Sequence, residues 1–218
     1  MRNIPLLLVT AIALLGAGAS GAGEAQPGRP PVVMVAPGAG KGGLAPATPA
    51  PEAGVTRVVP VPLEDPAFKP FGQIIEVPAG TPPSAENAVM KYWGGLARAR
   101  FHEDLEFGVI RIRARDRELA EMKRHVKSPV FLVALDCDFL LPVAPHSVPK
   151  AGKACPDAAR LKVFLVKKGQ AVLLSRGVWH TLPFPVAGEG LFIEAARDGT
   201  WKKDTVLRPF RGKETVKF

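Results

Sequence analysis

The sequence is poor in cysteine: Cys137 and Cys155 are its only two. Because neither lies in the N-terminal region, we expect no lipid anchor on an N-terminal cysteine. Their spacing is not that of a zinc site, although two free thiols or a metal pair stay open as alternatives. In an oxidising compartment we expect a disulfide between them, closing a loop rich in proline and glycine and contributing about 3 kcal/mol.

The apolar run at residues 4–15 is too short to cross a bilayer, which takes about 20 apolar residues. It follows Arg2 and precedes the small residues 16–23, an order typical of a secretory signal peptide. We therefore expect a signal peptide at residues 1–22 and a periplasmic or secreted protein with no membrane attachment after cleavage. An uncleaved membrane anchor is the alternative.

The chain has few aromatic residues, 7% of the total, and a net charge of +9. Part of the positive charge lies in the C-terminal tail, residues 202–217, where Phe210 is the single aromatic residue, so nucleic acid is not expected as a partner. Residues 23–60 are mostly proline, glycine and alanine and cannot bury enough apolar surface to fold. We expect a disordered linker there, followed by one domain at residues 61–218.

Short apolar runs separated by turn signals recur along the predicted domain, at residues 74–77, 107–112, 130–135, 161–166, 171–174 and 191–195. Such runs predict an all-β sandwich or barrel. Only residues 116–124 look helical, since Leu119 and Met122 lie one helical turn apart.

Residues 169–180 resemble the second sequence motif of the cupins, with Gly169, Gly177 and His180 at the usual spacing and Ser175 where proline is usual. Gly177 would permit a tight turn out of a buried strand, and His180 would then point into a barrel. The first cupin motif is poorer, because only His125 survives as a ligand. The resemblance implies a single cupin barrel, a double-stranded β-helix of the jelly-roll kind.

The order of several segments resembles the ureidoglycolate lyase family: residues 68–75 with Pro-Phe-Gly, residues 87–97, Arg124 with His125, and residues 177–180 with Trp-His. That family consists of cupin-fold dimers of purine catabolism that split ureidoglycolate into glyoxylate and urea, and a divalent metal is associated with it. The resemblance therefore implies a homodimer, a small carboxylate substrate and a divalent metal. The family's usual Glu-Arg-His is Lys-Arg-His here, with Lys123 in place of the acid, and a following glutamine is lost around Pro129.

Histidine titrates near neutrality, so His125 and His180 are the predicted acid and base, and also the predicted metal ligands. Glu194 shares a strand face with Phe192 and Ala196, where a buried acid needs a partner; it would orient a histidine or ligate the metal. The alternatives are a packed structural role for each histidine and an outward-facing Glu194.

A substrate carboxylate requires a cation. Arg124 or Arg113 could hold it with a planar guanidinium group, with Lys91 as a further cation, and Trp179 could wall the pocket. Alternation with apolar residues at positions 110–115 favours a solvated outer face for Arg113, and Trp179 could simply be a core residue.

Three functions stay open at this point. The first is a lyase acting on ureidoglycolate, the second is a non-catalytic exported cupin that binds a small carboxylate, and the third is a metal-dependent cupin with another activity. Fold alone does not choose among them.

Overall fold

The computed structural model describes residues 54–64, 66–77, 79–148 and 153–218, and almost all of its regular structure is β. The predicted signal peptide and most of the predicted linker lie outside these residues. Among the described residues, no helix is long and apolar enough to cross a membrane.

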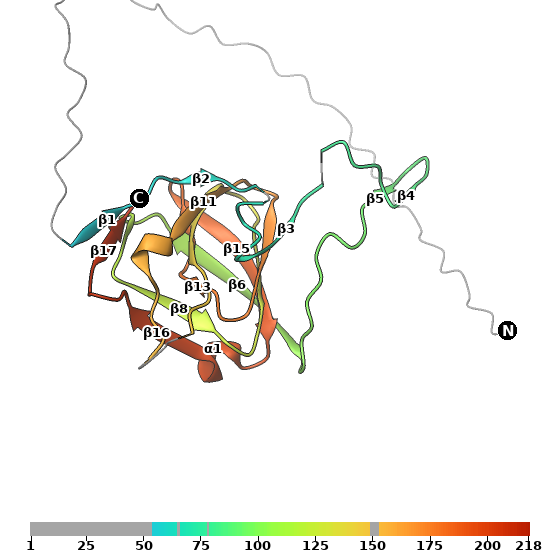
Figure 1. Ribbon diagram of the computed structural model, residues 1–218. Helices are drawn as coiled ribbons and strands as arrows, with labels where there is room; N and C mark the ends of the chain where they lie inside the picture. Colours follow the sequence, from blue (N-terminus) through green and yellow to red (C-terminus); the bar gives the residue numbers. More distant parts are fainter. Residues whose placement is uncertain (1–53, 65, 78, 149–152) are drawn as a thin grey trace, which may run out of the picture. The chain divides into compact units, whose positions relative to one another are not determined.

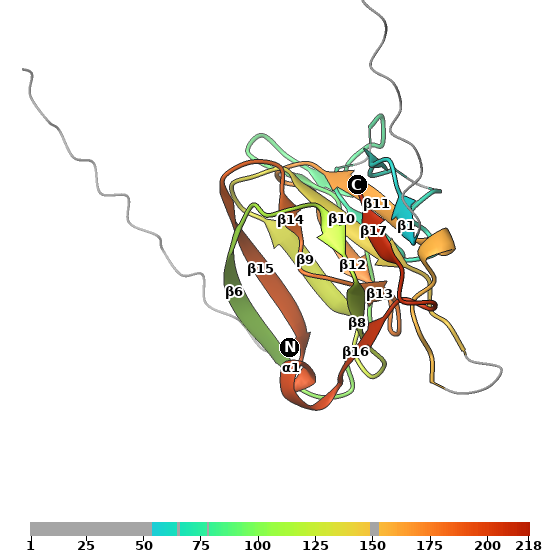
Figure 2. The same ribbon diagram turned by 90° about the vertical axis from the view of Figure 1, so that its left-hand side faces the viewer.

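Two sheets face one another and form the body of the domain (Figures 1 and 2). The first has the strand order β16-β8-β13-β10-β11-β2, with β14 paired to β10; its members are β2 (Val61–Pro62), β8 (Glu121–His125), β10 (Phe139–Ala144), β11 (Lys162–Val166), β13 (Trp179–His180), β14 (Phe184–Pro185) and β16 (Thr205–Pro209). The second has the order β3-β12-β9-β15-β6; its members are β3 (Gly72–Ile75), β6 (Leu105–Arg113), β9 (Val130–Ala134), β12 (Ala171–Leu174) and β15 (Glu189–Arg197).

The chain passes repeatedly from one sheet to the other, as in a jelly roll, and this is the cupin barrel that the sequence predicted. One apolar core lies between the sheets and includes Leu132, Phe164, Val172 and Phe192, all at 2% exposure or less. Inward side chains alternate with outward ones along the strands, so apolar residues of both sheets meet in the middle.

A second core covers the other face of the first sheet. It contains Met122, Trp179 and Phe210, and the small sheet β1-β17-β7 and the 3-10 turn η1 close it. These elements are β1 (Val55–Arg57), β7 (Glu118–Leu119), η1 (Ala158–Arg160) and β17 (Thr215–Lys217). The first sheet is therefore covered on both faces, and every residue of β10 is buried. Strand β1 falls inside the range expected to be linker, so the folded part begins earlier than predicted.

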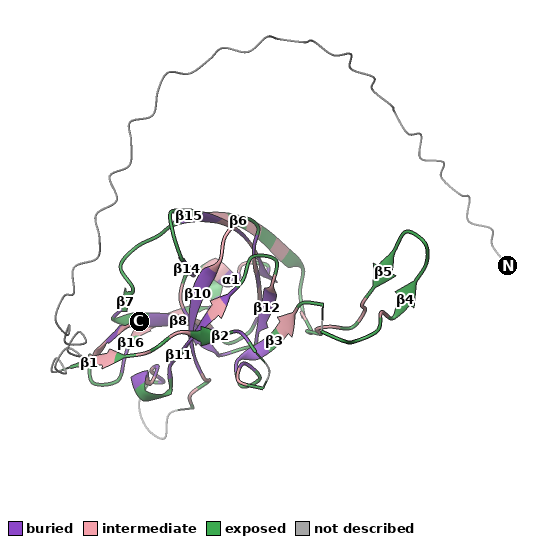
Figure 3. Cartoon of the chain, turned by 90° about the horizontal axis from the view of Figure 1, so that it is seen from above, coloured by how far each residue is buried: buried purple, intermediate pink, exposed green. Residues whose placement is uncertain are grey.

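A two-stranded hairpin, β4 (Ala85–Glu86) with β5 (Lys91–Tyr92), pairs with no other sheet. Figure 3 shows it as an exposed arm that stands away from the barrel. The remaining element, α1 (Thr200–Lys203), is a single helical turn between β15 and β16.

The six predicted strands all appear, within a few residues of their expected bounds. The helix predicted at residues 116–124 is wrong, because that segment forms β7 and β8. In β8, Met122 packs in the second core, while Lys123 and His125 lie on the opposite face. The helical pattern of this short segment is weak, so its pairing with β13 and β16 determines that it forms a strand.

Gly72, in the Pro-Phe-Gly segment, supplies a test of this packing. A Cβ atom at Gly72 would lie 2.1 Å from the carbonyl oxygen of Leu173, whereas one at Gly108, also in a strand, would meet nothing within 4 Å. We expect Gly72→Ala to destabilise the domain by about 2 kcal/mol or more, because a backbone atom cannot move aside cheaply.

The matched variant, Gly108→Ala, should be neutral or stabilising by up to about 1 kcal/mol, since alanine loses less backbone entropy than glycine on folding. Urea unfolding of the two variants and the parent checks the pair. Equal effects of the two substitutions would contradict the close approach of β3 to β12.

Candidate active site

Two histidines meet inside the barrel. His125 comes from β8 and His180 from β13, and their ring centroids lie 5.1 Å apart. His180 is directly opposite Lys123 in the strand pairing, and Lys123 lies on the same face of β8 as His125. Three polar side chains therefore converge on one region of an otherwise apolar interior.

Each imidazole is held through its Nδ1 atom by a backbone carbonyl. His180 Nδ1 is 3.0 Å from the carbonyl oxygen of Val178, and His125 Nδ1 is 3.3 Å from that of Asp204. A carbonyl oxygen only accepts hydrogen bonds, so both Nδ1 atoms carry the proton in the neutral tautomer. Both Nε2 atoms are then bare acceptors, and both are buried with no hydrogen-bond partner among the described residues.

The surroundings keep both imidazoles neutral. Burial lowers the pKa of His125 to about 4, and the positive charge of Lys123 acts in the same direction. Burial also lowers the pKa of His180 well below 6.5, again helped by Lys123 and by His125 itself. At neutral pH the site therefore offers two uncharged imidazoles, each with a free lone pair at Nε2.

Lys123 and Glu194 are the charged members of the site. Glu194 lies on β15 of the opposite sheet and is 6% exposed, on the same face as the core residue Phe192. Burial lowers the pKa of Lys123 and raises that of Glu194, and the mutual attraction of the two groups opposes both shifts. Each group thus compensates part of the cost of burying the other.

The helical turn α1 closes the site on one side. The ring of Trp201 lies edge-on to His125, with centroids 5.2 Å apart, and Lys123 Nζ lies 5.3 Å from the Trp201 ring centroid. Trp201 thus supports an imidazole and presents its face to the ammonium group.

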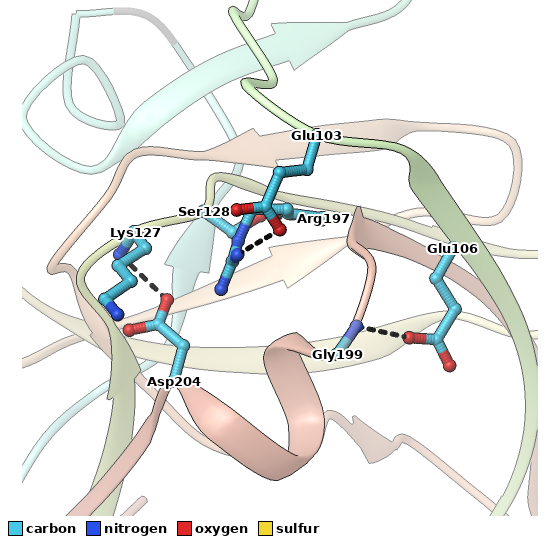
Figure 4. A network of polar contacts seen from close by, with 7 residues as sticks. All are labelled: Glu103, Glu106, Lys127, Ser128, Arg197, Gly199 and Asp204. Atoms are coloured by element: carbon cyan, nitrogen blue, oxygen red, sulfur yellow. Dashed lines mark hydrogen bonds and ion pairs between the residues drawn. The ribbon is translucent and has the colours of Figure 1, made fainter.

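Polar contacts on either side of α1 fix its position (Figure 4). After the turn, the Asp204 carboxylate accepts hydrogen bonds from the backbone N–H groups of Val126 and Lys127, at 3.2 and 2.8 Å. Before it, the Gly199 N–H donates to Glu106 at 3.2 Å, and Arg197 pairs with Glu103. The network ties α1 to β6, to β15 and to the end of β8.

The donor set does not fit a divalent metal. Among the described residues, no group of three or more His, Cys, Asp and Glu side chains is placed to hold a metal ion. The two free Nε2 atoms are suitable ligands, but the positive charge of Lys123 acts on both imidazoles and would repel a second cation.

The structure separates the other predicted site residues from the two histidines. Arg124 points to the opposite face of β8, where its guanidinium lies 4.6 Å from the Trp179 ring centroid and donates to the carbonyl oxygen of Ser147. Trp179 is fully buried in the second core. Arg113 is exposed on β6 near Glu189, and Lys91 pairs with Glu86 on the β4-β5 hairpin. None of these four side chains lies in the cluster formed by the histidines.

The predicted disulfide is not formed, since both cysteines are free. Cys137 lies after β9, where its sulfur packs near Gly190 of β15, and burial raises its pKa. Cys155 lies before η1, with its sulfur 3.4 Å from the carbonyl oxygen of Lys153. Each sulfur has its own contacts, one against the second sheet and one in its own loop.

Sequence reasoning missed Lys123 and Trp201 as members of the site. For Lys123 a signal was available, because in a strand it shares the face of His125 two residues on. The helical reading of residues 116–124 concealed it. For Trp201 no local pattern gives its position, which depends on the turn α1 and the contacts of Asp204.

Fold and site define a cupin whose barrel holds a buried polar cluster around two histidines. The chain belongs to the ureidoglycolate lyase family, whose sequence profile matches residues 55–208. It is 27% identical over 149 residues to the ureidoglycolate lyase of Chelativorans sp. (strain BNC1), which covers 66% of this chain and 86% of that protein.

A weaker similarity is to a solved structure, RmlC from Streptococcus suis in complex with dTDP-D-xylose. It is 10% identical with a TM-score of 0.32, and the match covers 43% of this chain and 44% of RmlC, so this chain spans less than half of the length of that structure.

Burial of the neutral His125 imidazole predicts how stability depends on pH. The unfolded chain takes up a proton near pH 6.5, whereas the folded chain does so only near pH 4. Between these values the unfolded state binds more protons, so the free energy of unfolding falls as the pH falls, by about 3 kcal/mol from this residue alone.

His125→Asn should therefore flatten the dependence between pH 6.5 and 4 in urea unfolding. The exposed His102→Asn serves as the control and should leave it unchanged. An unaltered slope in His125→Asn would mean that this imidazole is not buried in its neutral form.

Proposed function

We propose that this protein is a carbon-nitrogen lyase that cleaves ureidoglycolate to glyoxylate and urea by histidine acid/base chemistry. The observation that carries the proposal is the pair of buried imidazoles with unpartnered Nε2 atoms, in a member of the ureidoglycolate lyase family. Small-carboxylate binding inside the barrel is part of the same proposal.

The reaction moves one proton. A base removes the proton of the substrate hydroxyl, the carbon-oxygen double bond of glyoxylate forms, and the carbon-nitrogen bond to the urea group breaks. The departing nitrogen then needs a proton. A bare Nε2 accepts the first proton, and the imidazolium so formed returns it to the urea nitrogen, so that atoms and charge balance.

The two histidines divide this work by their surroundings. His180 is the proposed proton carrier, because its Nδ1–H is fixed at 3.0 Å on a carbonyl and its Nε2 therefore keeps one orientation. His125 supplies the second acceptor, which suits the N–H groups of a urea. Glu194 acts on the site through the charge of Lys123.

We expect the full-length chain to release glyoxylate from ureidoglycolate in a coupled assay, and His180→Asn to reduce kcat by about a hundredfold or more while the fold survives. Asparagine retains hydrogen bonding but cannot carry the proton. A structural histidine would show the reverse, a lower melting temperature with turnover per folded molecule intact.

The exposed His102→Asn is the control for this assay. Absence of glyoxylate from the parent chain, under conditions where a known ureidoglycolate lyase is active, would refute the proposed reaction. In that outcome the second candidate applies: a non-catalytic cupin that binds a small carboxylate, favoured by Lys123 standing where the family usually has glutamate.

A homodimer is also proposed, as the resemblance to the family implies. Strand β6 is the edge of the second sheet, and its outer face exposes Phe107 at 67% and Val109 at 69%. Beside Phe107 lies an apolar groove of about 290 Å³ that includes Phe101, Phe131 and Leu173. An exposed apolar patch of this kind marks an association surface.

Phe107→Asp should therefore convert a dimer to a monomer in light scattering coupled to size-exclusion chromatography, because a charge cannot be buried at an apolar interface without a partner. Val148→Asp, at an apolar residue that is 77% exposed, should leave the dimer intact. A parent chain that is monomeric at micromolar concentration would refute the dimer.

Export remains part of the proposal. It is supported by the short apolar run after Arg2 and the small residues that follow it. The proposed location is the periplasm or the outside of the cell.

A further inference from the structure

Lys123 is an unusual residue for its position. Its side chain is partly buried and lies inside the barrel with His125, opposite His180 in the strand pairing. Lysine rarely occupies such a place without a partner, because desolvation of the ammonium group is costly. The charge of Glu194 offsets part of this cost. The salt bridges of 4 Å or less between described residues do not include one between Lys123 and Glu194.

The hydrogen-bonding groups of the cluster do not match one another. The two Nε2 atoms are acceptors without donors among the described residues. The Lys123 ammonium can donate three hydrogen bonds, and no described side chain or carbonyl accepts one from it. The ammonium lies over the face of Trp201, and the charge of Glu194 acts on it. A ligand that combines an anionic acceptor with an adjacent O–H donor would satisfy both sides at once.

A 2-hydroxy carboxylate is such a ligand. Its carboxylate accepts charge-assisted hydrogen bonds from an ammonium group, and its hydroxyl, on the adjoining carbon, donates to an imidazole nitrogen. The barrel interior is of low polarity, which strengthens both contacts relative to water. A divalent metal would serve the same purpose in a site with more anionic ligands, but here the positive charge is already present in the chain.

We propose that Lys123 is the built-in cation of a metal-independent site for a small 2-hydroxy carboxylate, with the ammonium group binding the carboxylate and a bare Nε2 accepting the hydroxyl. The choice of acid rests on the proposed function, since ureidoglycolate is itself a 2-hydroxy carboxylate derivative. The binding site itself does not depend on turnover.

Three small probes separate the two contacts. Glycolate carries both the carboxylate and the hydroxyl, glycolamide lacks the charge, and acetate lacks the hydroxyl. Calorimetric titration of the full-length chain should give the tightest binding for glycolate. The difference should be about tenfold or more over glycolamide, since a hydrogen bond to a charged group has roughly this effect, and smaller over acetate, which loses only a hydrogen bond to a neutral imidazole.

Variants of Lys123 test the cation directly. Lys123→Met keeps the length of the side chain without the charge and should reduce glycolate affinity by about tenfold or more, to that of glycolamide. Lys123→Arg keeps the charge and should retain most of the affinity. Equal glycolate binding by the parent and Lys123→Met, both shown to be folded by thermal melting, would overturn the proposal.

The metal-independent part has its own experiment. Lys123→Glu would place a carboxylate on the face of His125 and opposite His180, completing a set of three ligands of the kind that binds zinc. After incubation with zinc and desalting, elemental analysis should find about one zinc ion per chain in Lys123→Glu, and none held by the parent or by Lys123→Gln. Retention of one zinc ion by the parent, lost on His180→Asn, would overturn this part.

The outcomes distinguish this proposal from the proposed reaction. Lys123-dependent glycolate binding without glyoxylate release would refute the lyase and leave the site in place. Glyoxylate release that survives Lys123→Met and is lost in the presence of EDTA would uphold the lyase and refute the metal-independent site.

Discussion

The burial of one positive charge is the constraint on which the rest of this site depends. The Lys123 ammonium lies among neutral imidazoles and an apolar core, and Glu194 on the facing sheet is the charge that offsets it. The same ammonium helps to hold both histidines in the neutral form. Removal of the positive charge would thus alter the proton affinity of every titratable group around it.

The fold makes this arrangement possible because the first sheet is covered on both faces. Alternation along β8 sends Met122 and Arg124 toward the second core and Lys123 and His125 into the barrel. A strand with solvent on one face could have turned its lysine outward. Here both faces are occupied, so the strand register that buries Met122 also fixes Lys123 in the interior.

Much of the fold followed from local patterns, since short apolar runs and the Gly177 turn before His180 predict strands and a barrel. The predictions that were wrong concerned features that depend on pairing between distant segments. Strand β10 was missed because Pro142 lies within it, and a proline inside an apolar run argues against a central strand. The cysteines were paired on compartment and loop length, yet their sulfurs lie in separate surroundings.

The site was predicted in part for the same reason. His125 and His180 stand in recognisable motifs. The cation for a carboxylate was sought in Arg113 and Arg124, because guanidinium binds carboxylates well, and in Lys91. The Arg124 guanidinium instead stacks on Trp179, on the face of the first sheet that is turned away from the histidines. Residue type indicated the chemistry needed, but only strand parity determined which neighbouring cation, Arg124 or Lys123, reaches the interior.

The protonation state of the cluster has a consequence for its chemistry. With both Nδ1–H groups bonded to carbonyls and both imidazoles neutral, neither Nε2 can act first as an acid. In the proposed reaction, two sources of the proton for the departing nitrogen are then the substrate hydroxyl, through one imidazole, and the Lys123 ammonium. Because an ammonium that lost its proton would leave Glu194 without a compensating charge, the route through the imidazole is the less costly one in the proposed reaction. It leaves the Lys123 ammonium charged, as the proposed carboxylate site requires.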